Sequence, residues 1–222
     1  MLIVCALLGL AAVTASAQDP VAVAPNQCKV VLENDYVRVL RWAEAPGDKV
    51  PMHEHPALVS ISLSANKTRF TSADGKAREG DAKAGQATWS DPERHSSQNL
   101  SAKAGEVIQV ELKTKPGAAM TALPASEDSV AVDPKHYKVV LQNDRVRVLR
   151  IHYAPNEKSV MHTHPASVAV FLTDGQTTFT LGDGTTTTAD VKPGQVLWND
   201  NQKHLPQNTG GKPFELILVE LR

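Results

Sequence analysis

Short stretches of alternating or β-branched residues recur along the whole chain. Val37 and Val39 are separated by Arg38, and further apolar stretches of this kind lie at residues 59–63, 107–112, 168–172 and 216–221. This pattern predicts strands, because successive side chains of a strand point to opposite faces. Pairs typical of turns separate the stretches at short intervals: Asn34-Asp35, Asp74-Gly75, Asn143-Asp144 and Asp183-Gly184. No segment shows a helical apolar stripe, so the pattern predicts an all-β sandwich or barrel.

One half of the chain repeats the other. Residues 29–41 reappear almost unchanged at 138–150, and the similarity continues at the same offset along both copies. A repeat of this length indicates two copies of one domain. The segment between the copies is rich in Pro, Gly and Ala, which is typical of a linker. We therefore expect two similar barrels or jelly rolls packed together, with these boundaries: leader 1–17, first domain 18–112, linker 113–129 and second domain 130–222.

The leader has the pattern of a secretory signal peptide. An apolar run from Leu2 to Val13 is followed by small residues up to Ala17, although no Lys or Arg precedes the run. The run has about 12 residues, fewer than the ~20 that a membrane span needs. We expect cleavage after Ala17, a secreted or periplasmic product, and no membrane attachment afterwards. Cys28 would then be the only cysteine of the mature chain, which leaves no intrachain disulfide.

Composition excludes some partners. The chain has 23 basic and 24 acidic residues and a formal net charge of -1. It therefore has no broad positive field to attract a phosphate backbone, and nucleic acid is not an expected partner.

Six of the eight histidines belong to the repeat. Each copy has two histidines separated by one residue, and a third about 40 residues later: His53, His55 and His95, then His162, His164 and His204. On a strand, this spacing places both imidazoles on one face, about 6.5–7 Å apart along the backbone. A pair of this kind is more often two ordinary histidines. With a third imidazole, however, it becomes a candidate site for Zn, Fe, Ni, Mn or Cu.

The residues around these histidines resemble the motifs of the cupin superfamily. Gly47 followed by five residues and His53-Glu54-His55 matches the first cupin motif, and the second copy has Asn156 in the glycine position. The second motif ends as in cupins, with His95 followed by Asn99 and His204 followed by Asn208. In more detail, the chain resembles small secreted cupins related to β-alanine-degradation proteins. The resemblance implies a double cupin with one divalent metal ion in each domain.

The chain departs from the cupin pattern at one metal-binding position. Ser60 and Ala169 stand where the cupin glutamate ligand is expected. The resemblance then implies three-histidine sites like those of cysteine dioxygenase-like cupins. Three neutral donors leave the metal charge uncompensated and several coordination positions open. Such a site favours a small anionic ligand.

Other polar residues of the repeat are candidates for orienting the histidines or a ligand. Gln98, Asn99, Gln207 and Asn208 follow the last histidine of each copy, and the asparagines are equally suited to closing a turn. Glu111 and Glu220 alternate with valines in the last predicted strand and can face the cavity, but glutamates are more often exposed to solvent.

Two classes of function remain open at this point. One is a mononuclear metal oxidoreductase of dioxygenase type that acts on a small anionic molecule. The other is a cupin that binds a small molecule or a metal without turnover. The fold does not decide between them, because function depends on the site. A monomer and a homo-oligomer are both compatible with two halves that can pair with each other.

Overall fold

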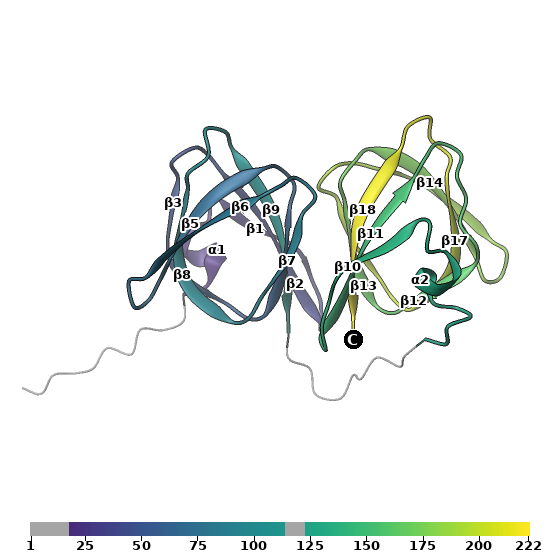
Figure 1. The fold of residues 1–222 in the computed structure, drawn as a ribbon, viewed down its shortest axis with the longest axis horizontal. Coiled ribbons are helices and arrows are strands. Elements are labelled where there is room, and N and C mark those ends of the chain that lie inside the picture. The colour runs from purple at the N-terminus through teal and green to yellow at the C-terminus, as the bar shows by residue number, and fades with distance from the viewer. Residues whose placement is uncertain (1–17, 114–122) are drawn as a thin grey trace, which may run out of the picture.

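The protein folds into two β-barrels that lie side by side (Figure 1). The structure is a computed structural model, and it describes residues 18–113 and 123–222. The all-β double barrel confirms the fold class expected from the sequence. The expected signal peptide, residues 1–17, and much of the expected linker lie outside the described residues. No helix in the described part is long and apolar enough to cross a membrane.

The first barrel consists of two sheets and one short helix. Its elements are α1 (Pro20–Val23), β1 (Cys28–Glu33), β2 (Val37–Glu44), β3 (Lys49–His55), β4 (Leu58–Ser62), β5 (Asn66–Ser72), β6 (Ala77–Ala82), β7 (Ala87–Ser90), β8 (Glu93–Asn99) and β9 (Gly105–Leu112). The strand order is β1-β2-β9-β4-β7 in the five-stranded sheet and β3-β8-β5-β6 in the four-stranded sheet. All neighbouring strands in this barrel are antiparallel.

The second barrel repeats this arrangement. Its elements are α2 (Ser129–Val132), β10 (Tyr137–Gln142), β11 (Val146–Tyr153), β12 (His162–His164), β13 (Ser167–Phe171), β14 (Gly175–Leu181), β15 (Thr186–Val191), β16 (Val196–Asn199), β17 (Gln202–Asn208) and β18 (Phe214–Leu221). The strand orders are β10-β11-β18-β13-β16 and β12-β17-β14-β15. Asp128, inside the expected linker, already caps α2, so ordered structure of the second half begins within that segment.

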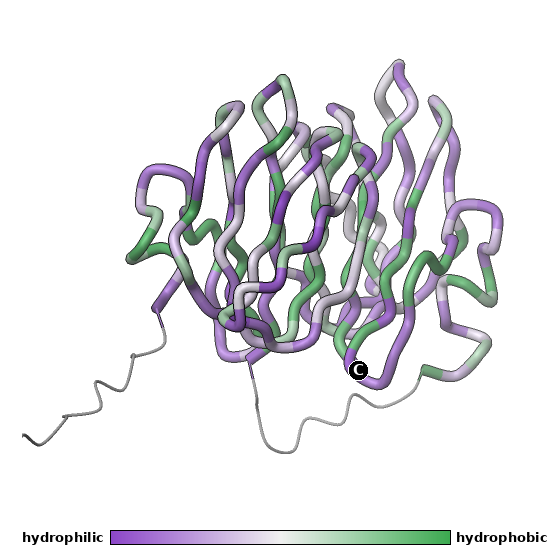
Figure 2. The backbone as a smooth tube through the Cα atoms, turned by 60° about the vertical axis from the view of Figure 1, so that its left-hand side comes forward, coloured by the Kyte–Doolittle hydropathy of each residue, from purple (hydrophilic) through white to green (hydrophobic). Residues whose placement is uncertain are grey.

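Each five-stranded sheet has an apolar face that is turned toward the other barrel. Along β2, Val37 and Val39 join a buried cluster that includes Val146 and Val148 of the other half, so this face packs against the second barrel. Leu40 packs instead in the separate core of the first barrel. Figure 2 shows hydrophobic and hydrophilic stretches alternating along the strands of both halves. One side of each five-stranded sheet therefore joins the barrels, and the other lines a barrel interior.

The contact between the barrels is nearly symmetric. Gly85 and Gly194 both have a φ of +75°, and an arginine of the other barrel lies against each of them. A Cβ atom on Gly85 would lie 3.1 Å from Arg150, and one on Gly194 would lie 3.2 Å from Arg41. Glycine is therefore favoured at both turns by the backbone conformation and by the close approach.

Candidate metal centres

Three histidines meet inside the first barrel. His53 and His55 lie on β3 with one residue between them, so both side chains are on the inner face. The antiparallel register of β3 and β8 places His95 directly opposite His53. One ring nitrogen of each histidine lies within 4.8 Å of those of the other two, and all three residues are buried. We call this group the first histidine cluster.

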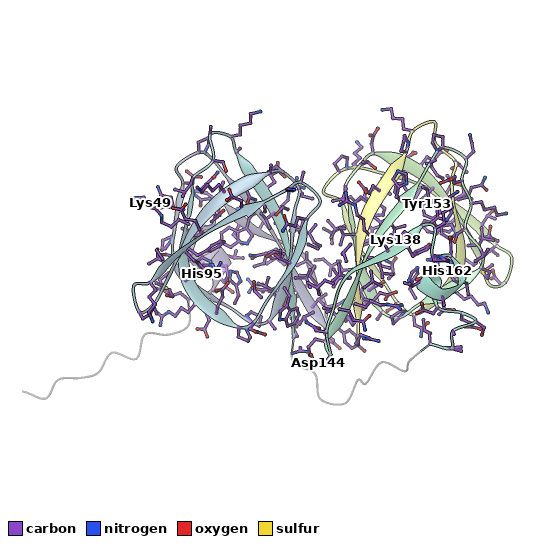
Figure 3. All side chains as sticks on the ribbon, viewed as in Figure 1. Lys49, His95, Lys138, Asp144, Tyr153 and His162 are labelled. Atoms are coloured by element: carbon purple, nitrogen blue, oxygen red, sulfur yellow. The ribbon has the colours of Figure 1, made fainter. Side chains whose placement is uncertain are left out.

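The second barrel builds the same group from β12 and β17. His162 and His164 alternate along β12, and His204 lies opposite His162 in the register. Their ring nitrogens also gather within 4.8 Å. Figure 3 labels His95 inside the first barrel and His162 inside the second. The structure therefore brings together all six histidines that the sequence singled out, in the two expected groups of three. We call His162, His164 and His204 the second histidine cluster.

Acceptors outside the clusters hold the Nδ1 atoms of four histidines. Nδ1 of His53 lies 2.7 Å from the carbonyl oxygen of Pro51, and Nδ1 of His162 lies 2.7 Å from that of Val160. A carbonyl oxygen only accepts hydrogen bonds, so each Nδ1 carries the proton and donates it. In a neutral ring, Nε2 then carries a lone pair.

Glu111 and Glu220 hold the other two histidines in the same way. Nδ1 of His55 lies 2.7 Å from Oε1 of Glu111, and Nδ1 of His164 lies 2.7 Å from Oε1 of Glu220. Both glutamates are buried, with Glu220 0% exposed. The expectation that these residues more often face solvent was wrong. Their alternation with the buried valines of β9 and β18 indicated the correct face, because the other face of each strand packs against the opposite barrel.

The two glutamates are themselves held by ion pairs. Arg147 contacts Oε2 of Glu220 and pairs at 2.7 Å with Asp128, and its side chain is only 13% exposed. Together, Asp128, Arg147, Glu220 and His164 form a continuous chain of contacts from the start of α2 to the second histidine cluster.

The first barrel contains the equivalent chain. Arg38 pairs with Asp19 and lies 3.7 Å from Oε2 of Glu111. This role of Arg38 and Arg147 was not singled out from the sequence. The signal that was available is that both copies contain Asp, Arg and Glu at equivalent positions.

Burial keeps several of the imidazoles neutral. Loss of solvation, the largest cause, lowers the pKa of His53 and of His162 to about 4. Burial, with smaller contributions from His164 and His162, lowers the pKa of His204 to about 3. At neutral pH these rings are uncharged, which is the form that donates a lone pair to a metal ion.

The nitrogens at the centre of each cluster fit a shared cation. Nε2 of His162 and Nε2 of His164 lie 3.0 Å apart, although both rings have their proton on Nδ1. Nε2 of His55 is buried without a hydrogen-bond partner among the described residues. Two facing lone pairs repel each other, and a cation bound by both removes the repulsion. Metal–nitrogen bonds of about 2.0–2.1 Å can span this separation, so the residues fit a divalent ion.

The side chains of the candidate residues that follow the last histidine of each copy make no hydrogen bond to the histidines in the described part of the chain. The side-chain amide of Asn99 donates to the carbonyl oxygens of Glu44, Ala45 and Lys103, and that of Asn208 makes the equivalent three bonds. These asparagines therefore connect loops at the end of each barrel. Gln98 and Gln207 make no side-chain hydrogen bond to a histidine among the described residues. Both alternate with the inward-facing asparagines. The bonds of the asparagines agree with the turn-closing alternative, and a role of the four residues in orienting a bound ligand stays a prediction.

Each histidine cluster borders a cavity, and the walls of the two cavities differ. The first cavity has a volume of about 300 Å³ and a mixed lining, in which polar residues such as Glu44, Ser60 and Gln109 stand beside aromatic and aliphatic ones. Burial, with a smaller contribution from Asp48, raises the pKa of Glu44 to about 7. The second cavity has a volume of about 250 Å³ and is lined mainly by aromatic and aliphatic residues. Ser60 and Ala169, at the position of the missing glutamate, both line their cavities.

Comparisons with known proteins agree with this architecture. The sequence pattern of the Cupin domain family matches residues 149–220. A comparison with curated proteins gave no match. Among solved structures, a variant of Bacillus subtilis oxalate decarboxylase, in which a tyrosine replaces one tryptophan, superposes with a TM-score of 0.61 at 12% identity, covering 87% of this chain and 71% of that one.

A second solved structure is a cupin 2 conserved barrel domain protein from Leptotrichia buccalis. It superposes with a TM-score of 0.52 at 11% identity, and 88% of each chain is covered. At such low identity, these likenesses concern the fold alone. Together with the family match in the second half, they show that the chain has the cupin fold, in two cupin-type barrels.

Proposed function

We propose that each histidine cluster binds one divalent metal ion, so that the protein is a metal-binding double cupin. One observation carries this proposal. In the second barrel, two imidazoles that donate through Nδ1 direct their Nε2 atoms at each other from 3.0 Å. A neutral, buried pair in this geometry repels unless a cation lies between the two nitrogens.

The surrounding residues prepare the clusters for a metal ion. Glu111 and Glu220 keep the proton on Nδ1 of His55 and His164, which leaves Nε2 free to bind and makes it a stronger donor. Arg38 and Arg147 hold these carboxylates in place. When bound, a divalent ion at such a site supplies Lewis-acid or redox chemistry to a ligand.

The finer proposal is a mononuclear oxidoreductase of dioxygenase type that acts on a small anionic molecule. Three neutral donors around a divalent ion leave positive charge that favours an anion. One solved structure with the same fold concerns the Mn(II) centres of Bacillus subtilis oxalate decarboxylase. Imidazole donors alone do not distinguish Mn from Fe, Zn, Ni or Cu.

Cobalt(II) titration followed by visible absorption tests the metal sites individually. We expect two Co(II) ions per chain in the protein, and one in each of the His53→Ala and His162→Ala variants. His152→Ala is the matched control, because His152 is exposed and belongs to neither cluster. A His162→Ala variant that still binds two ions would contradict the proposal.

Oxygen uptake tests the oxidoreductase proposal separately. The protein loaded with Fe(II) or Mn(II) is mixed with a panel of small carboxylic acids in an oxygen electrode. We expect uptake that disappears in a His53→Ala/His162→Ala variant. Stoichiometric metal with no uptake for any acid would favour the alternative, a cupin that binds without turnover.

We also propose that the protein is exported. This proposal rests on the apolar run and the small residues before Gln18. N-terminal sequencing of the protein recovered from cell fractions is expected to begin at Gln18. Full-length protein confined to the cytosol would contradict export.

A further inference from the structure

The two halves keep the same histidine clusters but differ in the walls of their cavities. The residues that differ occupy equivalent positions in the two copies of the repeat. Six positions that line both cavities are polar in the first barrel and aromatic or aliphatic in the second, apart from the phenol of Tyr153: Glu44 and Tyr153, Ser60 and Ala169, Ser62 and Phe171, Thr88 and Leu197, Ser97 and Pro206, and Gln109 and Leu218.

Three of these positions form one continuous row across the five-stranded sheet. In the second barrel, Ala169 pairs with Leu218 on one side and Leu197 on the other. Side chains directly opposite each other in neighbouring strands are in contact range. The row is therefore one apolar surface beside the second histidine cluster.

The same row in the first barrel is polar. Ser60 pairs with Gln109 and with Thr88 in the same register. Oε1 of Gln109 accepts a hydrogen bond of 2.6 Å from Nε1 of Trp42, so its amide nitrogen remains available as a donor. The two barrels therefore pair these strands in the same register, and the rows differ only in their side chains.

Aromatic residues complete the apolar lining of the second cavity. Tyr137 and Tyr153 share a hydrogen bond of 2.7 Å between their hydroxyl groups, so one phenol donates to the other. Phe171 and Phe214 pack against each other in the same cluster, with ring centroids 5.7 Å apart. The mainly apolar lining favours an apolar molecule over a hydrophilic one.

We propose that the two cavities take different classes of ligand: the first a hydrophilic, hydrogen-bonding molecule, and the second a small apolar molecule such as an aromatic hydrocarbon. The proposal goes beyond the metal centres and does not depend on them, because it concerns the walls. It limits the expected anionic ligand to the first barrel, where Ser, Thr and Gln side chains can bind it.

Equilibrium dialysis with naphthalene tests the proposal. The full protein is used twice, once treated with chelator and once loaded with Zn(II), and metal content is measured on the same samples. We expect one naphthalene per chain in both preparations. Failure of the metal sites would appear in the metal content alone, whereas failure of this proposal would appear in the naphthalene binding.

Reciprocal exchanges between the barrels provide the matched variants. Ala169→Ser/Leu197→Thr/Leu218→Gln gives the second barrel the polar row, and we expect its affinity for naphthalene to fall by at least about tenfold. Ser60→Ala/Thr88→Leu/Gln109→Leu gives the first barrel the apolar row. We expect this variant to keep the original site.

The single variant Leu197→Thr separates a loss of binding from a folding defect in the triple variant. Leu197 is 38% exposed, so its replacement is tolerated by the core, and circular dichroism checks the fold. We expect this single variant to weaken naphthalene binding as well. The proposal is overturned if the wild-type protein binds no naphthalene, if it binds two equivalents of similar affinity, or if both triple variants bind like the wild type.

Discussion

At the scale of single residues, the hydrogen bond made by Nδ1 of a histidine determines whether its Nε2 can bind a metal ion. The proton of His55 is held by Glu111 and that of His164 by Glu220, each at 2.7 Å. A histidine oriented in this way presents a fixed lone pair to its cluster. Neither barrel has the cupin glutamate ligand, but each has a buried carboxylate behind one of its histidines. Glu111 contacts His55, and Glu220 contacts His164.

Replacing such a carboxylate tests its role. Glu220→Gln removes the charge that holds the proton of His164, and we expect the affinity of the second site for Zn(II) to fall by roughly 10- to 100-fold. Competition with a chromophoric chelator measures this affinity. Glu215→Gln on the same strand is the control, because Glu215 pairs with Arg150 and contacts neither histidine cluster. Equal losses in both variants would contradict the role of Glu220.

Glu44 gives the first barrel a pH dependence of stability. Its pKa in the folded protein is about 7, against 4.5 in a free glutamate. The folded state therefore binds more protons between these values, so the contribution of Glu44 to stability falls as the pH rises from 4.5 to 7. We expect Glu44→Gln to gain stability relative to the wild type across this window in urea denaturation. A difference that is constant with pH would contradict this origin.

At the scale of elements, the pattern of apolar residues predicted most strands but not the contacts between distant segments. Val37 and Val39 alternate as the sequence indicated, and turns lie at pairs such as Asp183-Gly184. The four-residue helices α1 and α2 were missed, because a single turn has no apolar periodicity to detect. The sequence left open whether Glu220 faces the cavity or solvent, because its partner Arg147 lies 73 residues away in the sequence.

The capping residue of α2 connects this element to the site. Asp128 accepts hydrogen bonds from the backbone of Val130 and Ala131, and it also pairs with Arg147. We expect Asp128→Ala to lower the free energy of unfolding by about 1–2 kcal/mol. Asp174→Ala, at an exposed position on the same barrel, is the control. An equal change in the free energy of unfolding of both variants would contradict a stabilising role of Asp128 as the cap of α2.

At the scale of the whole molecule, the repeat predicted two similar barrels, and the structure adds that they share a core. Valines of β2 and β11 belong to one buried cluster that spans both halves. The sequence showed that these residues are apolar, but it did not show whether they face a barrel interior or the other barrel. The histidine clusters were predicted more fully, because their spacing on strands determines which faces they occupy.

The shared core makes each half depend on the other. Residues 123–222 expressed alone would expose Val146, Val148 and the rest of the buried face. An exposed apolar surface of this kind drives association. We therefore expect the isolated half to self-associate in sedimentation velocity experiments. A soluble monomer with cooperative unfolding would show that the interface contributes little to the fold.

The metal content of the protein purified without chelator tests the central claim most directly. Elemental analysis is made on the protein and on its His53→Ala/His162→Ala variant, before and after reloading with Fe(II), Mn(II) and Zn(II). The account predicts two metal ions per chain, one for each histidine cluster, and their loss in the variant. A protein that holds no metal even after reloading would contradict it, and would leave two barrels whose buried histidines serve another purpose.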